Sequence, residues 1–490
     1  MEKIIQLVKT LNPNEVRAIK RFFASSSRTQ INHRQLLFNN ILNGKVNDEN
    51  TGSKTIGRTS GDPAFIMLKK RLKDDILKVL VTEEGSKKFN SKYFEARYKC
   101  RLMIIEADLL LSRGVSLLGE EILKKSLVLA EQYELTNEAL ILYDLLQAHF
   151  GIKAGPEKYL EYSNKNKNHL VLSQKKFEAQ DYFRQLTMPQ IFSTNKNYLY
   201  KDQSALASKE LEKLAIESNS DEIQSWYLRS NIFYFHTIGD YISAREYATD
   251  FLDLANRSPV LNSKDNIGGA YMQLSIVNLL IRNYNEAFKF AENATKYFVK
   301  QSMNQVNALS FLFLAAIYDK QFDSALTIVK KVSEFKSITQ YKSIEAKWNY
   351  YKANLLFAQG KYDDALALLQ RENELISDKS GWRLGFKILE MMCIIELGYY
   401  DWLDFRIETF RKLLSDVKNE NVARPKLILQ IIKGFIKHMY DFKNTTNDLK
   451  EHFDLLASND VEYKWDPIGY EVIPFHEWWF NKISSNKIVA

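Results

Sequence analysis

The stretch QGKYDDALALL (Gln359–Leu369) carries the pattern that decides the fold: a glycine, an aromatic residue two positions later, and an alanine three positions after that. Four other stretches align with it: IGDYISAREYA (238–248), RNYNEAFKFA (282–291), KQFDSALTIV (320–329) and LGYYDWLDFRI (397–407). Their first aromatic residues are Tyr241, Tyr284, Phe322, Tyr362 and Tyr400, spaced 43, 38, 40 and 38 residues apart. A period near 40 residues is typical of stacked helical hairpins.

Each part of the pattern has a physical role at the turn between two antiparallel helices. Glycine tolerates the positive φ with which a helix often ends. The aromatic ring fills the junction, and a small alanine lets the two backbones approach closely; only Leu403 departs from alanine at that place. Because one such pair cannot bury its apolar face alone, neighbouring pairs are expected to stack.

The pattern resembles the tetratricopeptide repeat. Gly360, Tyr362 and Ala365 lie where that family has its turn glycine, aromatic residue and alanine, and the small Ala353 lies on the preceding helix. The family's first-helix Trp and Leu-Gly are mostly missing, and the period exceeds the usual 34 residues. The resemblance implies an all-α, right-handed α-solenoid of roughly nine tetratricopeptide-like helix pairs. The chain also resembles long helical-repeat proteins of AT-rich bacteria, a likeness that implies no function.

The composition supports this fold class. Only 18 Gly and 8 Pro occur in 490 residues, too few for the turns of a β-sandwich, a propeller or a Rossmann-type fold. Hydrophobic residues make up 45% of the chain, enough for a large core. The two cysteines, Cys100 and Cys393, cannot form a disulfide framework and are a poor metal site. We expect no metal and no cofactor.

Four regions are predicted: a basic helical N-terminal module at 1–90 with an exposed loop at 45–61, degenerate helix pairs at 91–224, tetratricopeptide-like repeats at 225–440 and a C-terminal cap at 441–490. In the module, helices are expected to start at Pro13, His33 and Pro63. The inward residues of the third are predicted to be Phe65, Ile66, Leu68, Leu72, Ile76, Leu77 and Leu80. Between 91 and 224 we expect helices at 92–113, 117–133, 135–150, 156–168, 174–193 and 202–217, with a turn at 195–202. Seven aromatic residues between Tyr463 and Ile483 suit an end cap.

Positive charge gathers at the N-terminus. The chain carries a formal net charge of +8, and residues 1–100 alone carry +10. This asymmetry points to a polyanionic partner for the module or, more simply, to a solvated basic face. If the three helices read nucleic acid, the phosphate contacts would come from Lys69, Lys70, Arg71 and Lys73. No recognition-helix pattern is present, and the linker before the third helix is long for a helix-turn-helix, which favours a cap or docking module instead.

No motif for catalysis stands out. Gly52–Thr59 (GSKTIGRT) is one residue away from a phosphate-binding loop, with Arg58 in place of lysine, but no strand is expected before it, so we interpret it as a coincidence. The seven histidines lie in no zinc-type spacing, and no nucleophile motif occurs. The sequence therefore predicts a protein that is not an enzyme.

A partner would be expected on the concave face, which the first helix of each pair forms in the family. The family's register places two groups of residues there: Trp226, Arg229, Phe233 and His236 in one repeat, and Lys347, Tyr350, Asn354 and Phe357 in another. Lys347 and Asn354 match two places of a clamp for a peptide's C-terminal carboxylate. Other repeats have Ile276, Leu314 and Met392 where that clamp needs asparagine, which argues against it. An apolar and aromatic groove for a partner segment is the better interpretation, the alternative being that these residues are core.

The leading prediction is a non-enzymatic, cytoplasmic scaffold that binds a protein or peptide. No secretory signal pattern and no apolar run long enough to cross a membrane are found. The alternative is a regulator whose N-terminal module binds nucleic acid while the solenoid senses a partner. The sequence gives no indication of the oligomeric state.

Overall fold

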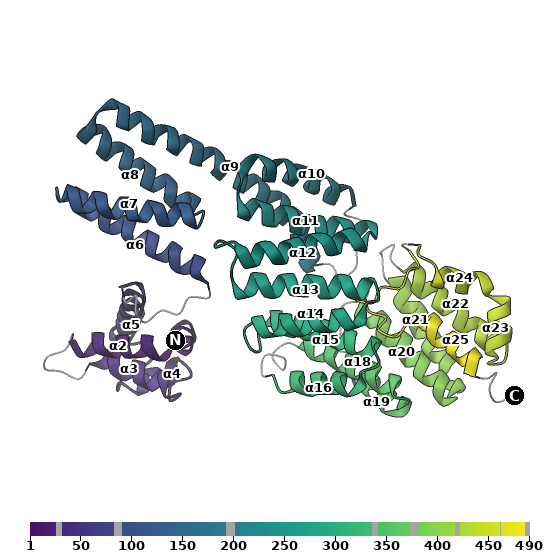
Figure 1. The fold of residues 1–490 in the computed structure, drawn as a ribbon. Helices are drawn as coiled ribbons and strands as arrows, with labels where there is room; N and C mark the ends of the chain where they lie inside the picture. Colours follow the sequence, from purple (N-terminus) through teal and green to yellow (C-terminus); the bar gives the residue numbers. More distant parts are fainter. Residues whose placement is uncertain are drawn as a thin grey trace. The chain divides into compact units, whose positions relative to one another are not determined.

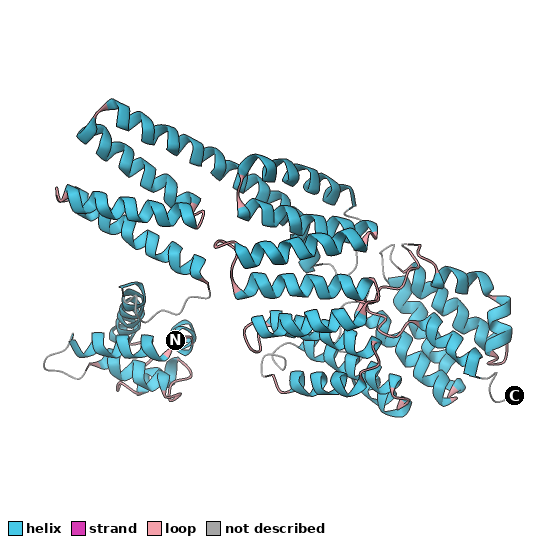
Figure 2. Ribbon diagram, in the orientation of Figure 1, coloured by secondary structure: helices cyan, strands magenta, loops and turns pink. Residues whose placement is uncertain are grey.

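The structure is a computed structural model that describes residues 1–25, 32–82, 91–192, 201–335, 342–372, 381–416, 422–460 and 462–485. The described elements are α-helices, apart from one 3-10 turn (η3, Tyr400–Trp402) and an isolated bridge between Ser91 and Ser263 (Figure 2). The chain forms two compact units, Met1–Asn90 and Ser91–Ala490. None of the described helices is both long and apolar enough to span a membrane.

The first unit is a small helical bundle. Its helices are α1 (Glu2–Lys9), α2 (Pro13–Ser25), α3 (His33–Leu42), α4 (Glu49–Lys54) and α5 (Pro63–Thr82). Phe23, Phe38 and Phe65 are fully buried at its centre. The predicted helix starts at Pro13, His33 and Pro63 are confirmed.

The exposed loop predicted at 45–61 is wrong in part, because α4 lies within it. The Asp48 carboxylate accepts from the Thr51 amide (2.7 Å) while the Thr51 hydroxyl accepts from the Asp48 amide (3.1 Å), a capping box that starts a helix without any apolar period. Arg58, in the turn after α4, pairs with Asp62 at 2.7 Å.

The inward face of α5 is narrower than predicted. Ile66 and Leu77 are 52% and 44% exposed, because the buried stripe follows Phe65, Leu72 and Ile76 instead. The two misplaced residues lie one position to the side of that stripe, and in a helix one position is a rotation of about 100°.

The second unit is an all-α solenoid whose helices stack in chain order (Figure 1). Its helices are α6 (Lys92–Ser112), α7 (Ser116–Gln132), α8 (Thr136–Ala154), α9 (Pro156–Phe192), α10 (Lys201–Ser218), α11 (Asp221–Ile238), α12 (Tyr241–Arg257), α13 (Lys264–Leu280), α14 (Tyr284–Tyr297), α15 (Met303–Tyr318), α16 (Phe322–Ser333), α18 (Lys342–Ala358), α19 (Tyr362–Glu372), α20 (Trp382–Leu397), α21 (Leu403–Asp416), α22 (Ala423–Lys437), α23 (Phe442–Asp448), α24 (Lys450–Ala457) and α25 (Phe475–Ser485). The predicted fold class, an all-α solenoid of tetratricopeptide-like helix pairs, is confirmed.

The repeat turn has the same geometry five times. The first helix of each pair ends at a residue with positive φ, between 57° and 81°, and the second helix or turn starts at the predicted aromatic residue two positions later. The positive-φ residues are Gly239, Arg282, Lys320, Gly360 and Gly398. The four predicted alanines and Leu403 are fully buried, so the positive-φ turn and the buried position three residues after the aromatic residue are confirmed.

Two of these turns have a residue other than glycine at the positive-φ position, where the backbone conformation is strained for any residue with a side chain. We expect Lys320→Gly, at an exposed turn with φ 57°, to stabilise the chain by about 1 kcal/mol, and Gly360→Ala, at φ 75°, to destabilise it by a similar amount. Urea unfolding of the two variants measures both effects. Changes of the same sign would contradict the common turn geometry.

The predicted helices 156–168 and 174–193 are one continuous helix, α9, so the break between them was wrong. Neither glycine nor proline occurs between residues 157 and 188 to interrupt it. Its first half packs against α8 and its second half against α10 and α11. Helix α9 is therefore shared by two successive helix pairs. The predicted turn at 195–202 falls largely outside the described residues.

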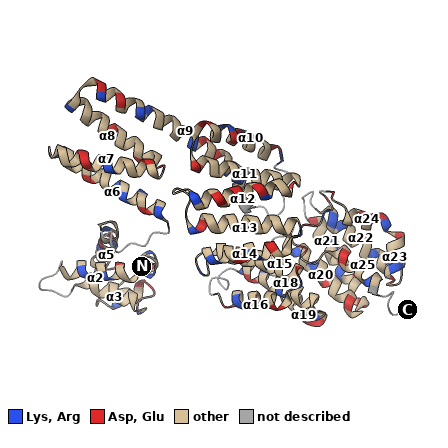
Figure 3. Cartoon of the chain, viewed as in Figure 1, with Lys and Arg blue, Asp and Glu red and all other residues tan. Residues whose placement is uncertain are grey.

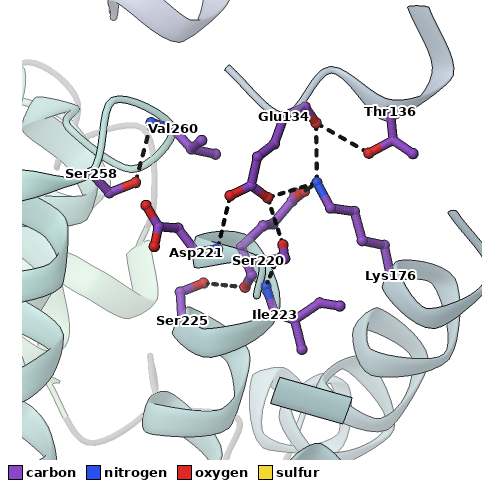
Figure 4. Close-up of polar contacts among 10 residues, drawn as sticks. Glu134, Thr136, Lys176, Ser220, Asp221, Ile223, Ser225, Ser258 and Val260 are labelled. Carbon is purple, nitrogen blue, oxygen red and sulfur yellow. Dashed lines mark hydrogen bonds and ion pairs between the residues drawn. The ribbon is translucent and has the colours of Figure 1, made fainter. Parts of the chain in front are cut away.

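A partly buried ion pair fixes α9 to its neighbours (Figure 4). The Glu134 carboxylate, in the turn between α7 and α8, accepts from the Ser220 hydroxyl (2.5 Å) and the Asp221 amide (2.8 Å) and pairs with the Lys176 ammonium of α9 at 2.9 Å. Burial raises the pKa of Glu134, but Lys176 and the donated hydrogen bonds outweigh it, so the pKa lies below its ordinary value. The network ties three successive parts of the solenoid together.

Candidate functional site

The five repeat turns give the first helices a common register. Counting back ten residues from each positive-φ residue gives Arg229, Met272, Ser310, Tyr350 and Ile388, and counting back six gives Phe233, Ile276, Leu314, Asn354 and Met392. Together with the positions three and thirteen residues back, these residues form a surface that we call the inner face. It contains the eight residues predicted to bind a partner.

Exposure changes sharply along the inner face. On α11 and α13, Arg229, Phe233, Met272 and Ile276 are half-buried. From α15 to α20, every residue at the same two register positions is buried. Since the register is shared, the difference depends on what covers the later helices.

The chain's own C-terminal segment, residues 462–485, covers that part of the inner face. After α24 the segment has no helical structure up to residue 474. It runs along the solenoid and then forms α25 (Figure 1). The Tyr318 hydroxyl donates to the Pro467 carbonyl (2.7 Å), and the Tyr350 hydroxyl donates to the Tyr470 carbonyl (2.6 Å). Two successive first helices thus hold the segment by its main chain, as a groove would hold an extended peptide.

The segment packs closely against α20 at a position that has no side chain. A Cβ atom at Gly385 would lie 2.2 Å from the Tyr470 carbonyl oxygen and 2.7 Å from the Tyr350 hydroxyl. Further on, Trp478 of α25 packs against Phe357 with ring centroids 6.3 Å apart, and its indole nitrogen donates to Glu396 (2.6 Å). Lys482 pairs with the same carboxylate.

Arg424 of α22 anchors the segment: four of its five N–H groups donate to the segment and the fifth donates to the end of α24. Its Nε and Nη2 donate to the two Glu471 oxygens at 2.6 and 2.8 Å, and Nη1 donates to the carbonyls of Leu456 (2.9 Å) and Tyr463 (2.6 Å). Nη2 also donates to His476 Nδ1 at 3.0 Å, which places the imidazole proton on Nε2. Burial and the Arg424 charge keep the pKa of His476 below its ordinary value, so the ring is neutral.

A cleft of about 670 Å³ lies where the segment passes the ends of α11, α13 and α24. His236, Tyr241, Arg282, Lys464, Tyr470 and His476 are among its lining residues. Lys464 lies 4.5 Å from the Tyr241 ring centroid, and Arg282 lies 5.1 Å from that of Trp465. Burial, with a smaller contribution from Lys464, lowers the pKa of His236 to about 4, so this histidine is neutral at pH 7.

The predicted partner-binding residues divide into two groups. Tyr350, Asn354 and Phe357 are at most 5% exposed, covered by the C-terminal segment or by neighbouring helices. The Asn354 amide donates to the Tyr350 carbonyl (2.9 Å), so its donor faces its own helix and not a ligand. Trp226 is also buried, whereas Arg229, Phe233, His236 and Lys347 keep part of their surface.

The two cations of the inner face lie against aromatic rings. The Arg229 guanidinium is 4.4 Å from the ring centroid of Phe183 and 5.6 Å from that of Phe251. The Lys347 ammonium is 4.6 Å from the Trp382 ring and 5.4 Å from the Tyr351 ring. Burial lowers the pKa of Arg229 to about 10 and that of Lys347 to about 8.

The depressed pKa of Lys347 predicts a pH-dependent stability. Between about pH 8 and the ordinary lysine value of 10.5 the unfolded chain binds more protons at this site than the folded chain, so stability rises with pH there. We expect Lys347→Met to lack this rise, while the exposed Lys352→Met keeps it. Urea unfolding at pH 7 to 10 measures the difference; parallel curves for the wild type and Lys347→Met would contradict it.

The predicted polyanion-binding residues of α5 do not form one free cluster. Lys69 pairs with Glu49 and lies 5.0 Å from the Phe65 ring, and Lys73 lies 3.4 Å from Asp74. Lys70 and Arg71 are exposed.

Sequence reasoning missed the residues that hold the C-terminal segment, namely Tyr318, Arg424, Tyr470 and Glu471. Gly385 was the one available signal, because a glycine inside an otherwise apolar helix often marks a close approach of another backbone. In the described parts of the chain, no group of three or more His, Cys, Asp or Glu side chains is arranged to hold a metal ion.

Comparison with known proteins gives only distant likenesses. No family model matches the chain, and no curated protein matches it. Among solved structures, yeast Tom70 is similar over 92% of this chain and 96% of its own, with 11% identity and a TM-score of 0.37. A signal transduction ATPase with a tetratricopeptide repeat sensor, from Pyrococcus horikoshii, matches over 74% of this chain with 17% identity and a TM-score of 0.32. The match spans about half of that chain (52%). The tetratricopeptide-like fold of this chain follows from its repeat geometry and not from these likenesses.

Proposed function

We propose that the chain is a non-enzymatic interaction protein that binds an extended segment of a partner protein on the part of the inner face formed by α11 and α13. The observation that carries this proposal is the C-terminal segment itself. The later helices of the same register hold an irregular peptide through tyrosine hydroxyls and main-chain carbonyls, while α11 and α13 leave the equivalent positions half-exposed. A cytoplasmic location stays a prediction.

The open part of the inner face has the character of a peptide site. Phe233, Met272 and Ile276 offer half-buried apolar and aromatic surface. His236, three residues after Phe233 on α11, lines the cleft that the C-terminal segment forms with the ends of α11 and α13. Such a mixture of apolar surface and a few placed polar groups is typical of ligand sites.

Selection from a random dodecapeptide library displayed on phage, against the immobilised full chain, tests the proposal. We expect selected peptides to bind the wild type and to lose at least tenfold in affinity to the double variant Phe233→Ala/Ile276→Ala. The matched control is Ile242→Ala, an exposed residue of α12 outside the inner face. Failure to select any peptide, or equal loss in the control, would contradict the proposal. Tyr350 and Phe357 are unsuitable targets, because truncating buried rings tests folding rather than binding.

A second candidate function is nucleic-acid binding by the first unit, which would make the chain a regulator. The observation in its favour is that Lys70 and Arg71 are exposed on successive positions of α5. Titration of a labelled duplex with the full chain at two salt concentrations tests it, with Lys70→Gln/Arg71→Gln as the variant. Unchanged binding by the variant would remove this candidate.

A further inference from the structure

The stretch KWDPIG (Lys464–Gly469) of the C-terminal segment forms one wall of the cleft at the ends of α11, α13 and α24. Aspartate first, proline second and glycine fourth are preferred residues of a type I turn. The Gly469 amide accordingly donates to the Asp466 carbonyl (3.0 Å), and the Ile468 amide donates to Asp466 Oδ1 (3.0 Å). The turn therefore holds the Asp466 side chain in a fixed place in the wall of the cleft.

Most of the charge in the cleft comes from this segment. Helices α11 and α13 end at the cleft, but α11 has no Lys, Arg, Asp or Glu from Ser230 to Ile238, and α13 has none from Asn266 to Leu280 (Figure 3). Among the described residues, three basic and three acidic side chains line the cleft, namely Arg282, Arg424, Lys464, Glu462, Asp466 and Glu471.

Most of these charges are satisfied by the protein or by solvent. Arg424 and Glu471 pair with each other at 2.6 Å. Arg282 pairs with Glu477 of α25 at 3.0 Å. Glu462 is exposed. Two half-buried side chains of opposite charge remain.

These two side chains are Lys464 and Asp466, and neither forms an ion pair within the described part of the chain. The Lys464 ammonium donates to the Tyr241 hydroxyl (3.1 Å), which leaves its other N–H groups for a ligand. Asp466 Oδ2 accepts no hydrogen bond from the described residues. Burial raises the pKa of the Asp466 carboxyl, and the Ile468 amide and the Lys464 charge offset only part of this. A ligand that supplied the missing partners would recover the free energy of desolvation.

We propose that the cleft binds a free α-amino acid, whose carboxylate pairs with Lys464 and whose ammonium pairs with Asp466. The volume of about 670 Å³ lies within the range of about 300–1,000 Å³ that is typical of small-molecule sites. The rings of Tyr241 and Tyr470 line the cleft and offer surface for the side chain of the ligand. This site is additional to the proposed peptide site and does not depend on it.

The placement of the two charges favours an amino acid over other charged ligands. The Cα atoms of Lys464 and Asp466 are at most about 7 Å apart, which suits a ligand whose two charges are close together. The two ends of a longer peptide are too far apart to reach both residues at once. A phosphate group would bring its negative charges close to the Asp466 carboxylate, where they would be repelled.

Thermal unfolding of the full chain with each of the standard amino acids tests the inference. A ligand that binds the folded chain stabilises it, so at about 10 mM we expect at least one amino acid to raise the thermal midpoint. Calorimetric titration then compares that amino acid with its carboxamide, which lacks the carboxylate, and with its N-acetyl derivative, which lacks the ammonium. Each derivative is expected to bind at least tenfold more weakly, because one buried charge is left without its partner.

Two variants assign each charge of the ligand to its partner. Lys464→Met is expected to bind the amino acid and its carboxamide equally weakly. Asp466→Asn, whose side-chain oxygen can still accept from the Ile468 amide, is expected to bind the amino acid and its N-acetyl derivative equally weakly. The matched controls are Lys450→Met and Asp454→Asn, exposed residues of α24 that do not line the cleft, which should bind as the wild type does.

Several results would overturn the inference. If no amino acid raises the thermal midpoint, or if either derivative binds the wild type as tightly as the amino acid, the cleft does not recognise both charges of an amino acid. Tighter binding of triglycine than of the amino acid would assign the cleft to a peptide end instead. Equal losses in the controls would mean that the effect is not specific to the cleft. The comparison of derivatives uses the wild-type chain, so it stays decisive even if a variant fails to fold.

Discussion

Replacing Arg424 with methionine is expected to lower the free energy of unfolding by about 3–5 kcal/mol. The substitution leaves the buried Glu471 carboxylate without its bidentate partner and deprives two carbonyls and His476 of a donor. Because the lost contacts hold the C-terminal segment, we expect residues 462–474 to exchange their amide hydrogens faster before the solenoid unfolds. Urea unfolding and hydrogen exchange followed by mass spectrometry measure the two effects.

The control for this variant is Arg411→Met, which removes an exposed ion pair with Glu408 and should change stability little. A second variant, Arg424→Met/Glu471→Leu, should recover part of the loss because it removes both buried charges together. Equal effects of Arg424→Met and Arg411→Met would contradict the anchoring role of Arg424.

Adding one methyl group at Gly385 is expected to destabilise the chain by about 1–3 kcal/mol. The Cβ would lie 2.2 Å from a backbone oxygen of the C-terminal segment, so the segment must move and lose the hydrogen bond from Tyr350. Gly269→Ala is the matched control, since Gly269 has the same register on α13 and faces open space. There the methyl group should stabilise the helix by about 0.5–1 kcal/mol.

The opposite signs make this pair of variants informative. Both change the same atoms at the same register position in a helix interior, so helix propensity cancels between them. Unfolding curves that shift in the same direction would mean that the C-terminal segment does not cover the inner face at α20.

The repeat could be predicted from the sequence because each part of its pattern follows from local geometry. Gly360 needs positive φ, Tyr362 starts the second helix and Ala365 lies where two backbones meet, so the spacing of three residues specifies a turn. The start of α5 at Pro63 follows from local preferences in the same way.

The errors came from features that local patterns do not contain. Helix α4 depends on a side-chain cap at Asp48, not on an apolar period. The continuity of α9 reflects the absence of any residue that breaks a helix, which a weak apolar pattern around Asn168 obscured.

The sequence predicted which residues occupy equivalent positions on the inner face, but it did not predict how exposed each of them is. The family's register located Arg229 and Tyr350 at equivalent positions, but not the fact that one is half-exposed and the other buried. That difference arises from a segment 120 positions further along the chain. There the Tyr470 carbonyl accepts a hydrogen bond from the Tyr350 hydroxyl. Contacts of such sequence separation leave no periodic signal, so aromatic richness near the C-terminus indicated a cap without indicating which surface it covers.

Thiol labelling at two equivalent positions tests the division of the inner face most directly. Ile276→Cys on α13 and Met392→Cys on α20 both lie six residues before a repeat turn, and the native Cys100 and Cys393 are buried. We expect a maleimide to label the folded Ile276→Cys chain much faster than the folded Met392→Cys chain, with equal rates after unfolding. Similar rates in the folded state would contradict it, because the C-terminal segment would then not separate a covered part of the inner face from an open one.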